Sequence, residues 1–217
     1  MITLYAAYNF PPFLKGLVRD LRARWALAEL DLPYAIHWLD TSQSEHKGEA
    51  NRTVNPFGKM PAMTDGAMTL FESAAIVHYL FEKAGRAPKD ADARAHELQW
   101  SFAALNTIEP ILFEIFMWDN FWTERPGRET RRSEVVGFAQ TRLAELERAL
   151  GAKPYLTGDA LAPCDILMAS VLRFALGEPQ AFETAPGIVA YRERCYARPC
   201  FRSVLARHGE REETLAA

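Results

Sequence analysis

Segments that resemble β-strands occur only in the first third of this chain, and this division constrains the fold more than any other feature. Residues 2–7 (ITLYAA) and 34–40 (YAIHWLD) are short, apolar runs typical of buried strands. Residues 16–30 lie between them and repeat apolar side chains at helical spacing, with arginines on the opposite face. A strand, a helix and a second strand in this order predict a βαβ unit.

A β-hairpin is expected next, within the segment GKMPAMTDG. Asp65-Gly66 between two short apolar runs is a strong hairpin signal, which predicts strands near 61–64 and 67–70. Pro61 cannot donate a hydrogen bond to a sheet, so it belongs at the open end of the first strand. A helix from Glu72 to Lys83 would complete an α/β domain with a mixed four-stranded sheet.

The second part of the chain reads as helical throughout. Residues 84–91 contain Gly85 and Pro88 and are typical of a linker. We therefore predict an α/β domain over 1–83, a linker over 84–91 and an all-α domain over 92–217. Its helices are expected at 92–122, with a kink at Pro110, and at 128–150, 163–176, 186–197 and 199–208.

Charge, hydropathy and cysteine content exclude several classes of protein. The net charge of −3 gives no electrostatic case for binding nucleic acid, and the sequence has no run of 18 apolar residues that would span a membrane. The N-terminus does not read as a secretion signal. Cys164, Cys195 and Cys200 have spacings typical of neither a zinc site nor a redox pair. We expect reduced thiols, no metal and a cytoplasmic location.

Three motifs, in order, carry a resemblance to a known family. NPFGKMPAM at 55–63 and FESAAI at 71–76 resemble the N-terminal motifs of the glutathione transferase superfamily, and YLTG at 155–158 followed by PCDI at 163–166 resembles its C-terminal motif. The match extends over nearly the whole chain. It implies a thioredoxin-like N-terminal domain, a bacterial-type cytosolic enzyme, glutathione as co-substrate, and a homodimer.

Glu72-Ser73 is the first candidate binding element. Unpaired N–H groups and the helix dipole make a helix N-terminus a site for anions. The Ser73 hydroxyl adds a donor, and Glu72 can pair with an ammonium group, so the two residues suit the α-amino acid end of glutathione. Ser73 as a simple helix cap is the alternative.

Pro61 is the second candidate, because an X-Pro bond adopts the cis form at low cost. A cis Met60-Pro61 bond would leave the Met60 backbone free to pair with an extended peptide. In the family this residue pairs with the cysteinyl backbone of glutathione. Lys47, Lys59 and Arg52 are candidates for its glycyl carboxylate, or are ordinary solvated charges.

The group that would activate the glutathione thiol is left open by the sequence. Family members use a Tyr, Ser or Cys after the first strand, but residues 5–16 contain neither Ser nor Cys. The absence of Cys argues against the thiol-disulfide branch of the family. Tyr8 and Asn9 remain as hydrogen-bond donors, with Tyr5 and Arg19 as alternatives.

The second substrate is expected to bind between the two domains, against the long helix. Asn106 and Glu109 are one turn apart and share a face, where they would reach the glutathione amine or brace neighbouring helices. Phe113 and Met117 belong to an apolar cluster that would line the acceptor pocket. Asp165 is expected to be structural, at the third position of a helix.

These features predict an enzyme that directs the thiolate of glutathione at a small, largely apolar electrophile. Conjugation, substitution and peroxide reduction all fit. A glutathione-dependent isomerase or dehalogenase and a non-catalytic binding or regulatory protein remain as alternatives. Partners other than glutathione, the electrophile and a second copy of the chain are not expected.

Overall fold

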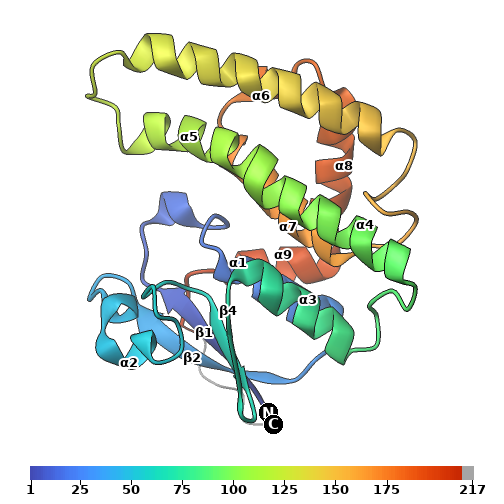
Figure 1. The fold of residues 1–217 in the computed structure, drawn as a ribbon. Helices are drawn as coiled ribbons and strands as arrows, with labels where there is room; N and C mark the ends of the chain where they lie inside the picture. The colour runs from blue at the N-terminus through green and yellow to red at the C-terminus, as the bar shows by residue number, and fades with distance from the viewer. Residues whose placement is uncertain (212–217) are drawn as a thin grey trace. The chain divides into compact units, whose positions relative to one another are not determined.

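A four-stranded mixed sheet forms the centre of the first of two structural units (Figure 1). Its strands are β1 (Ile2–Tyr8), β2 (Tyr34–Asp40), β3 (Ala62–Asp65) and β4 (Met68–Phe71), in the spatial order β2-β1-β3-β4. β1 is parallel to β2 and antiparallel to β3, and β3 is antiparallel to β4. The computed structural model describes residues 1–211. It confirms the mixed α/β sheet expected from the sequence.

Three longer helices belong to the same unit. They are α1 (Asp20–Glu29), α3 (Ser73–Lys83) and α9 (Pro199–Ala206), and α1 packs against both of the others. The short helix α2 (Glu49–Arg52) lies in the connection from β2 to β3. Ile2, Leu4 and Ala6 alternate along β1 and are buried, as expected for a strand with one face under helices.

The second unit, Pro88–Ala197, is helical. It contains α4 (Ala91–Phe102), α5 (Glu109–Asn120), α6 (Arg128–Leu150), α7 (Pro163–Leu172) and α8 (Pro186–Tyr196). Every residue of α7 is buried, because α4, α5 and α8 all pack around it. The fold therefore has the two-part character that the sequence indicated.

The boundary between the units differs from the expected one in one respect. The sequence assigned everything from residue 92 onward to the helical domain, whereas α9 groups with the first unit. The reason is a tertiary contact between α9 and α1. The ring centroids of Phe201 in α9 and Trp25 in α1 lie 4.6 Å apart, and both side chains are fully buried. Helical periodicity predicts that α9 exists, but it does not say which unit it covers.

The long helix expected over 92–122 is divided. A π-helical turn, Ala103–Ile108, separates α4 from α5, and Pro110 is the second residue of α5. Proline lacks an N–H and its ring clashes with the carbonyl four residues earlier, so a regular α-helix cannot continue through it. The wider π turn accommodates the interruption. No helix within residues 1–211 is both long and apolar enough to cross a membrane.

Candidate functional site

The first part of the candidate site is the open end of strand β3. Ala62 pairs with Tyr5 on one side and with Phe71 on the other, and regular pairing stops there. The Met60-Pro61 peptide bond just before it is cis, as the sequence analysis expected. Met60 precedes β3 and lies outside the regular ladder, so its backbone stays the candidate partner for an extended peptide.

The second part is the N-terminus of α3, which follows β4 directly. Ser73 is the first residue of this helix and is 4% exposed. Glu72 precedes it with φ at 71°, in the left-handed region that residues other than glycine rarely adopt, and its side chain is exposed. An unfavourable backbone conformation held at the mouth of a helix is typical of functional sites.

Arg22 supplies positive charge to this helix end. Its Nη1 donates a hydrogen bond to Ser73 Oγ at 3.1 Å, and both side chains are buried. The guanidinium adds to the positive potential of the α3 dipole. An incoming carboxylate would therefore find a cation, a hydroxyl and the backbone N–H groups of a helix N-terminus together.

Two of the arginines on the face of α1 opposite its apolar residues are buried. Arg22 and Arg24 are each 2% exposed. The guanidinium of Arg24 lies 5.5 Å from the centre of the Trp38 ring. Because α1 is surrounded by the sheet, α3 and α9, its polar face has no access to solvent. No sequence signal distinguishes such an arginine from a surface one.

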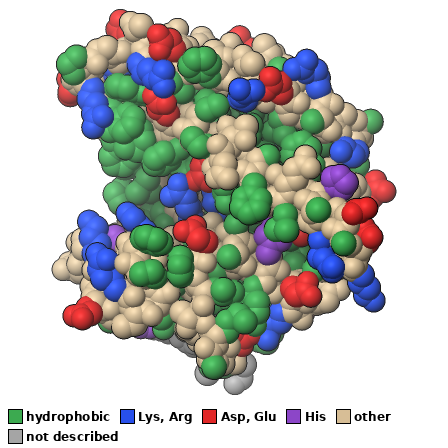
Figure 2. All heavy atoms as spheres, in the orientation of Figure 1, with side chains coloured by type: hydrophobic (Ala, Val, Ile, Leu, Met, Phe, Trp, Pro, Cys, Tyr) green, Lys and Arg blue, Asp and Glu red, His purple; other side chains and the backbone are tan. Residues whose placement is uncertain are grey.

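A basic cluster lies in the connection between β2 and β3. Lys47 and Lys59 are exposed, and their charges, together with the larger effect of burial, lower the pKa of His46. Arg52 donates to the carbonyls of Lys47 and Pro56, both at 3.1 Å, so it braces the loop. Figure 2 shows Lys and Arg side chains over the region where Figure 1 places α2. The two lysines remain available to an anion.

The candidates for thiol activation occupy different environments. Tyr8 is the last residue of β1 and not part of the loop, and its ring packs edge-on against Trp38 with centroids 6.2 Å apart. Its hydroxyl makes no hydrogen bond to the residues described. Tyr5 contacts the His37 ring at 4.7 Å, and strand alternation places it on the opposite face of the sheet from Tyr8. Arg19 is exposed immediately before α1.

The Asn9 amide is already engaged. Its nitrogen lies 3.2 Å and 3.3 Å from the two carboxylate oxygens of Asp40 and donates to Ser42 Oγ at 3.0 Å. Asn9 also has φ at 58°, which asparagine tolerates better than most residues. These contacts attach the start of the loop to the end of β2, whereas the Tyr8 hydroxyl makes no such bond within residues 1–211.

The candidate residues of the helical unit differ in exposure. Asn106 lies in the π turn and is exposed, whereas Glu109 is 6% exposed. Their shared face and their contact with the glutathione amine stay predictions. Phe113 packs against Phe174 with ring centroids 5.2 Å apart. Met117 is half-buried on α5.

Asp165 has the structural role expected of it. Its carboxylate accepts from the Leu156 N–H, the Ala162 N–H and the Tyr191 hydroxyl, each at 2.9 Å. Ala162 has no side-chain acceptor, so only half of a reciprocal capping box is present. Burial raises the pKa of this carboxyl to about 6, although the three hydrogen bonds oppose the shift. Within residues 1–211, no cluster of His, Cys, Asp or Glu could hold a metal ion.

The geometry defines a protein with a thioredoxin-like unit, a helix N-terminus that carries a buried arginine beside Ser73, and a helical second unit. Residues 21–83 match the family Glutathione S-transferase, N-terminal domain. Human glutathione S-transferase theta-1 is 29% identical over 195 residues, which cover 85% of this chain and 81% of that protein.

Solved structures of glutathione transferases share the fold. A family member from Pseudomonas fluorescens, with two glutathione molecules bound, superposes with a TM-score of 0.83 at 23% identity, covering 94% of this chain and 92% of that one. One from Burkholderia graminis gives 0.84 at 24% identity, covering 97% and 89%. Residues 21–83 thus match a glutathione S-transferase N-terminal domain, and the chain is similar to glutathione S-transferases over most of its length.

Proposed function

We propose that this protein binds glutathione in its first unit and directs the thiolate of glutathione at a small, largely apolar electrophile. One observation carries the proposal: Arg22, Ser73 and the α3 N-terminus lie next to the open end of β3. The β3–β4 register places Pro61 opposite Glu72, so a backbone-pairing site and a carboxylate site are adjacent. Glutathione is a peptide with a free carboxylate and ammonium group at one end, and it suits both.

Each end of glutathione has its partners in this proposal. The γ-glutamyl carboxylate binds at Ser73, with Arg22 behind it, and the ammonium group pairs with Glu72. The cysteinyl backbone pairs with Met60, ahead of Pro61. Lys47 and Lys59 meet the glycyl carboxylate, because both are exposed and close enough together to act on His46. The glutathione-bound relatives support the choice of ligand.

Tyr8 is the residue we assign to the thiol. A thiol of ordinary pKa is mostly protonated at neutral pH, so a donor that stabilises the thiolate raises the concentration of nucleophile. The Tyr8 hydroxyl can donate at the end of β1, and the geometry commits the Asn9 amide elsewhere. In this proposal the protein acts in the cytoplasm as a homodimer, as the family resemblance implies.

A glutathione-binding protein without catalytic activity is the second candidate. The observation in its favour is that the Asn9 amide is engaged by Asp40 and Ser42, which removes one of the two polar groups that follow β1. Such a protein would keep the Met60 and Ser73 sites and lose thiolate formation.

Two measurements on the purified chain separate these functions. Retention on immobilised glutathione tests the ligand, and conjugation of a generic aryl halide tests turnover. We expect both. Ser73→Ala should weaken retention, and Ser203→Ala, on the exposed side of α9, serves as the matched control. Failure of the wild-type chain to bind would reject the glutathione site, whereas binding without turnover of any electrophile would favour the second candidate.

A further inference from the structure

The segment that follows α9 returns to the loop between β1 and α1. We call residues 206–211 the C-terminal strap. The Asn9 N–H donates to the Gly209 carbonyl at 3.3 Å, and Lys15 Nζ donates to the Ala206 carbonyl at 2.6 Å. The strap therefore contacts this loop at Asn9, next to Tyr8, and again at Lys15.

His208 is the centre of the strap and is 1% exposed. Its Nδ1 accepts a hydrogen bond from the Gly16 N–H at 2.9 Å. A ring nitrogen that accepts from a backbone N–H carries no proton, so the proton of the neutral ring is on Nε2. Nε2 lies 3.3 Å from Asp20 Oδ1 and donates to it. A backbone N–H thus fixes both the tautomer and the orientation of the imidazole.

The contact with His208 matters for Asp20, because this carboxylate has few other partners. It is the first residue of α1 and is fully buried, and its Oδ2 has no hydrogen-bond partner. The α1 dipole and the His208 N–H are the interactions that stabilise its carboxylate. His208 thereby joins Gly16, in the loop before α1, to the first turn of α1.

The strap also packs against the loop between β1 and α1 through Phe10. The Phe10 and His208 rings lie 5.1 Å apart. Gly209 has φ at 94°, and a Cβ there would lie 2.8 Å from Phe10 Cζ, so only glycine fits beneath this ring. The Arg211 guanidinium lies 5.7 Å from the centre of the Tyr8 ring. The strap therefore contacts Tyr8 itself as well as the loop that follows it.

We propose that His208 is a positioning residue for thiol activation: through Gly16 and Asp20 it fixes the loop and α1, and so sets where the Tyr8 hydroxyl meets the thiol of glutathione. The inference rests on the function proposed above. It assigns to the C-terminal strap an effect on the reactivity of bound glutathione and not on its affinity, because the contacts proposed at Met60 and Glu72 lie on other elements, and Arg22 is held in place by its own hydrogen bond to Ser73.

Two conservative substitutions separate the two hydrogen bonds of the imidazole, one with the Gly16 N–H and one with Asp20. His208→Asn places an amide oxygen near the position of Nδ1 and can still accept from the Gly16 N–H. His208→Gln places an amide nitrogen near the position of Nε2 and keeps a donor for Asp20. A purely structural role would respond to loss of packing in both, whereas a positioning role through Gly16 should spare His208→Asn.

The test compares both variants with wild type and with the control Ser203→Ala. The readouts are glutathione Kd by calorimetry, the pKa of the bound thiol by ultraviolet thiolate absorbance, and kcat with an aryl halide. For His208→Gln we expect a higher thiol pKa and a kcat roughly 10- to 100-fold lower, since small displacements of reacting groups have effects of that size. Its Kd should stay within about twofold. His208→Asn should recover most of the kcat.

Lys15→Met provides a second route if a buried variant fails to fold. This substitution removes the exposed hydrogen bond from Lys15 to the Ala206 carbonyl. It should lower kcat, but by a smaller factor than His208→Gln does. Equal kcat and thiol pKa in all folded variants, or losses in Kd and not in kcat, would overturn the positioning role. If the wild-type chain itself does not bind glutathione, the proposed function fails instead, and calorimetry on the wild type identifies that case.

Discussion

The Arg22 guanidinium donates a hydrogen bond to Ser73 Oγ at 3.1 Å and places a buried positive charge at the N-terminus of α3. This pair joins α1 to the helix end that we propose binds the γ-glutamyl carboxylate. Hydrogen bonds to charged groups contribute about 1.5–3 kcal/mol. Arg22→Met should therefore weaken glutathione binding by roughly 10- to 150-fold. Calorimetry measures the effect, with a melting curve to verify that the variant is folded.

Arg202→Met is the matched control for this prediction, since Arg202 is exposed on α9 of the same unit. Adding Ser73→Ala to Arg22→Met should cost less affinity than Ser73→Ala costs alone, because the two side chains act on one carboxylate. A Kd within twofold of wild type for folded Arg22→Met would show that the pair has only a structural role.

Tyr8→Phe tests the proposed thiol donor with minimal change in volume. Removing one donor to a developing anion typically lowers kcat by roughly 10²- to 10³-fold. We expect that loss together with a raised pKa of the bound thiol and an unchanged Kd for glutathione. Stopped-flow conjugation and ultraviolet titration provide the two readouts.

Asn9→Gly is the matched comparison, because glycine keeps the left-handed backbone while removing the amide. Its kcat should fall much less than that of Tyr8→Phe, since the amide contacts Asp40 and Ser42 and supports the loop without acting on the thiol. If Asn9→Gly lost activity and Tyr8→Phe kept it, the assignment would pass to Asn9.

Local signals in the sequence were sufficient for the elements but not for the environments of their side chains. Strand β2 at 34–40 and helix α6 at 128–150 have the expected bounds, because each has strong periodicity and clear stop signals. Motif resemblance likewise identified the cis Met60-Pro61 bond, and the helix expected from Glu72 begins one residue later, at Ser73. These features are encoded within a few residues of each other.

The remaining features depend on contacts between distant segments. Arg22 is buried because α9, about 180 positions later, covers α1. His208 is significant only because the strap returns to Gly16, and a single histidine after a helix gives no such signal. The π turn at Ala103–Ile108 was not expected, because such a turn has no reliable sequence signature. Sequence periodicity describes a helix in isolation and not what surrounds it.

Asp165 predicts a specific dependence of stability on pH. Its pKa is raised from 3.8 to about 6, mainly by burial. Between these values the folded chain holds a proton that the unfolded chain has lost. The stabilising contribution of this group is therefore complete below about pH 4 and is lost as the pH rises through 6. The loss approaches roughly 3 kcal/mol, at 1.36 kcal/mol for each pKa unit.

Comparison of wild type with Asp165→Asn isolates this contribution, because other carboxylates titrate in both proteins. The variant is expected to be less stable, since its amide NH₂ would face the backbone donors of Leu156 or Ala162. The stability advantage of the wild type, measured by urea unfolding, should shrink as the pH rises from 4 to 7. A constant difference would show that the carboxyl titrates normally in the folded chain.

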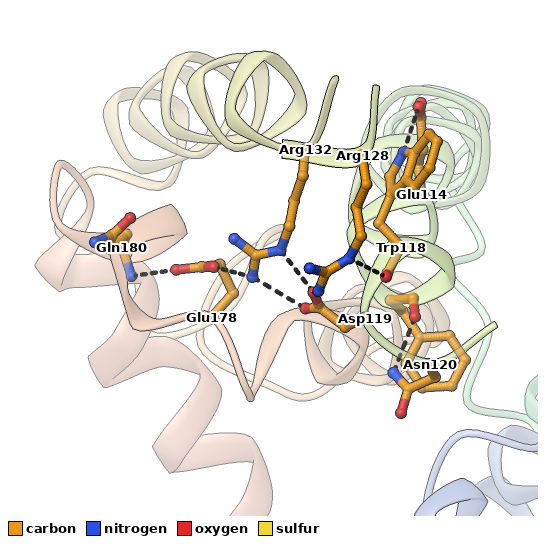
Figure 3. A network of polar contacts seen from close by, with 9 residues as sticks. Glu114, Trp118, Asp119, Asn120, Arg128, Arg132, Glu178 and Gln180 are labelled. Atoms are coloured by element: carbon orange, nitrogen blue, oxygen red, sulfur yellow. Dashed lines mark hydrogen bonds and ion pairs between the residues drawn. The ribbon is translucent and has the colours of Figure 1, made fainter. Parts of the chain in front are cut away.

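Arg132 organises an ion-pair network in the second unit (Figure 3). Its guanidinium donates to both carboxylate oxygens of Asp119, at 2.6 Å and 3.1 Å, and also contacts Glu178, whose side chain is 7% exposed. Asp119 and Glu178 raise the pKa of the guanidinium further above its usual value. The network ties α5 and α6 to the segment before Pro179, and Arg128 adds a weaker contact to Asp119 at 3.8 Å.

Arg132→Met should lower the free energy of unfolding by roughly 2–4 kcal/mol, because it leaves the buried Glu178 carboxylate without its cation. Arg142→Met, on the same helix, removes an exposed pair with Glu145 and should cost no more than about 0.5 kcal/mol. Adding Glu178→Gln to Arg132→Met should recover part of the loss, since it removes the unpaired charge. Urea unfolding measures all three variants. Equal effects of Arg132→Met and Arg142→Met would mean that solvent screens the network as it screens a surface pair.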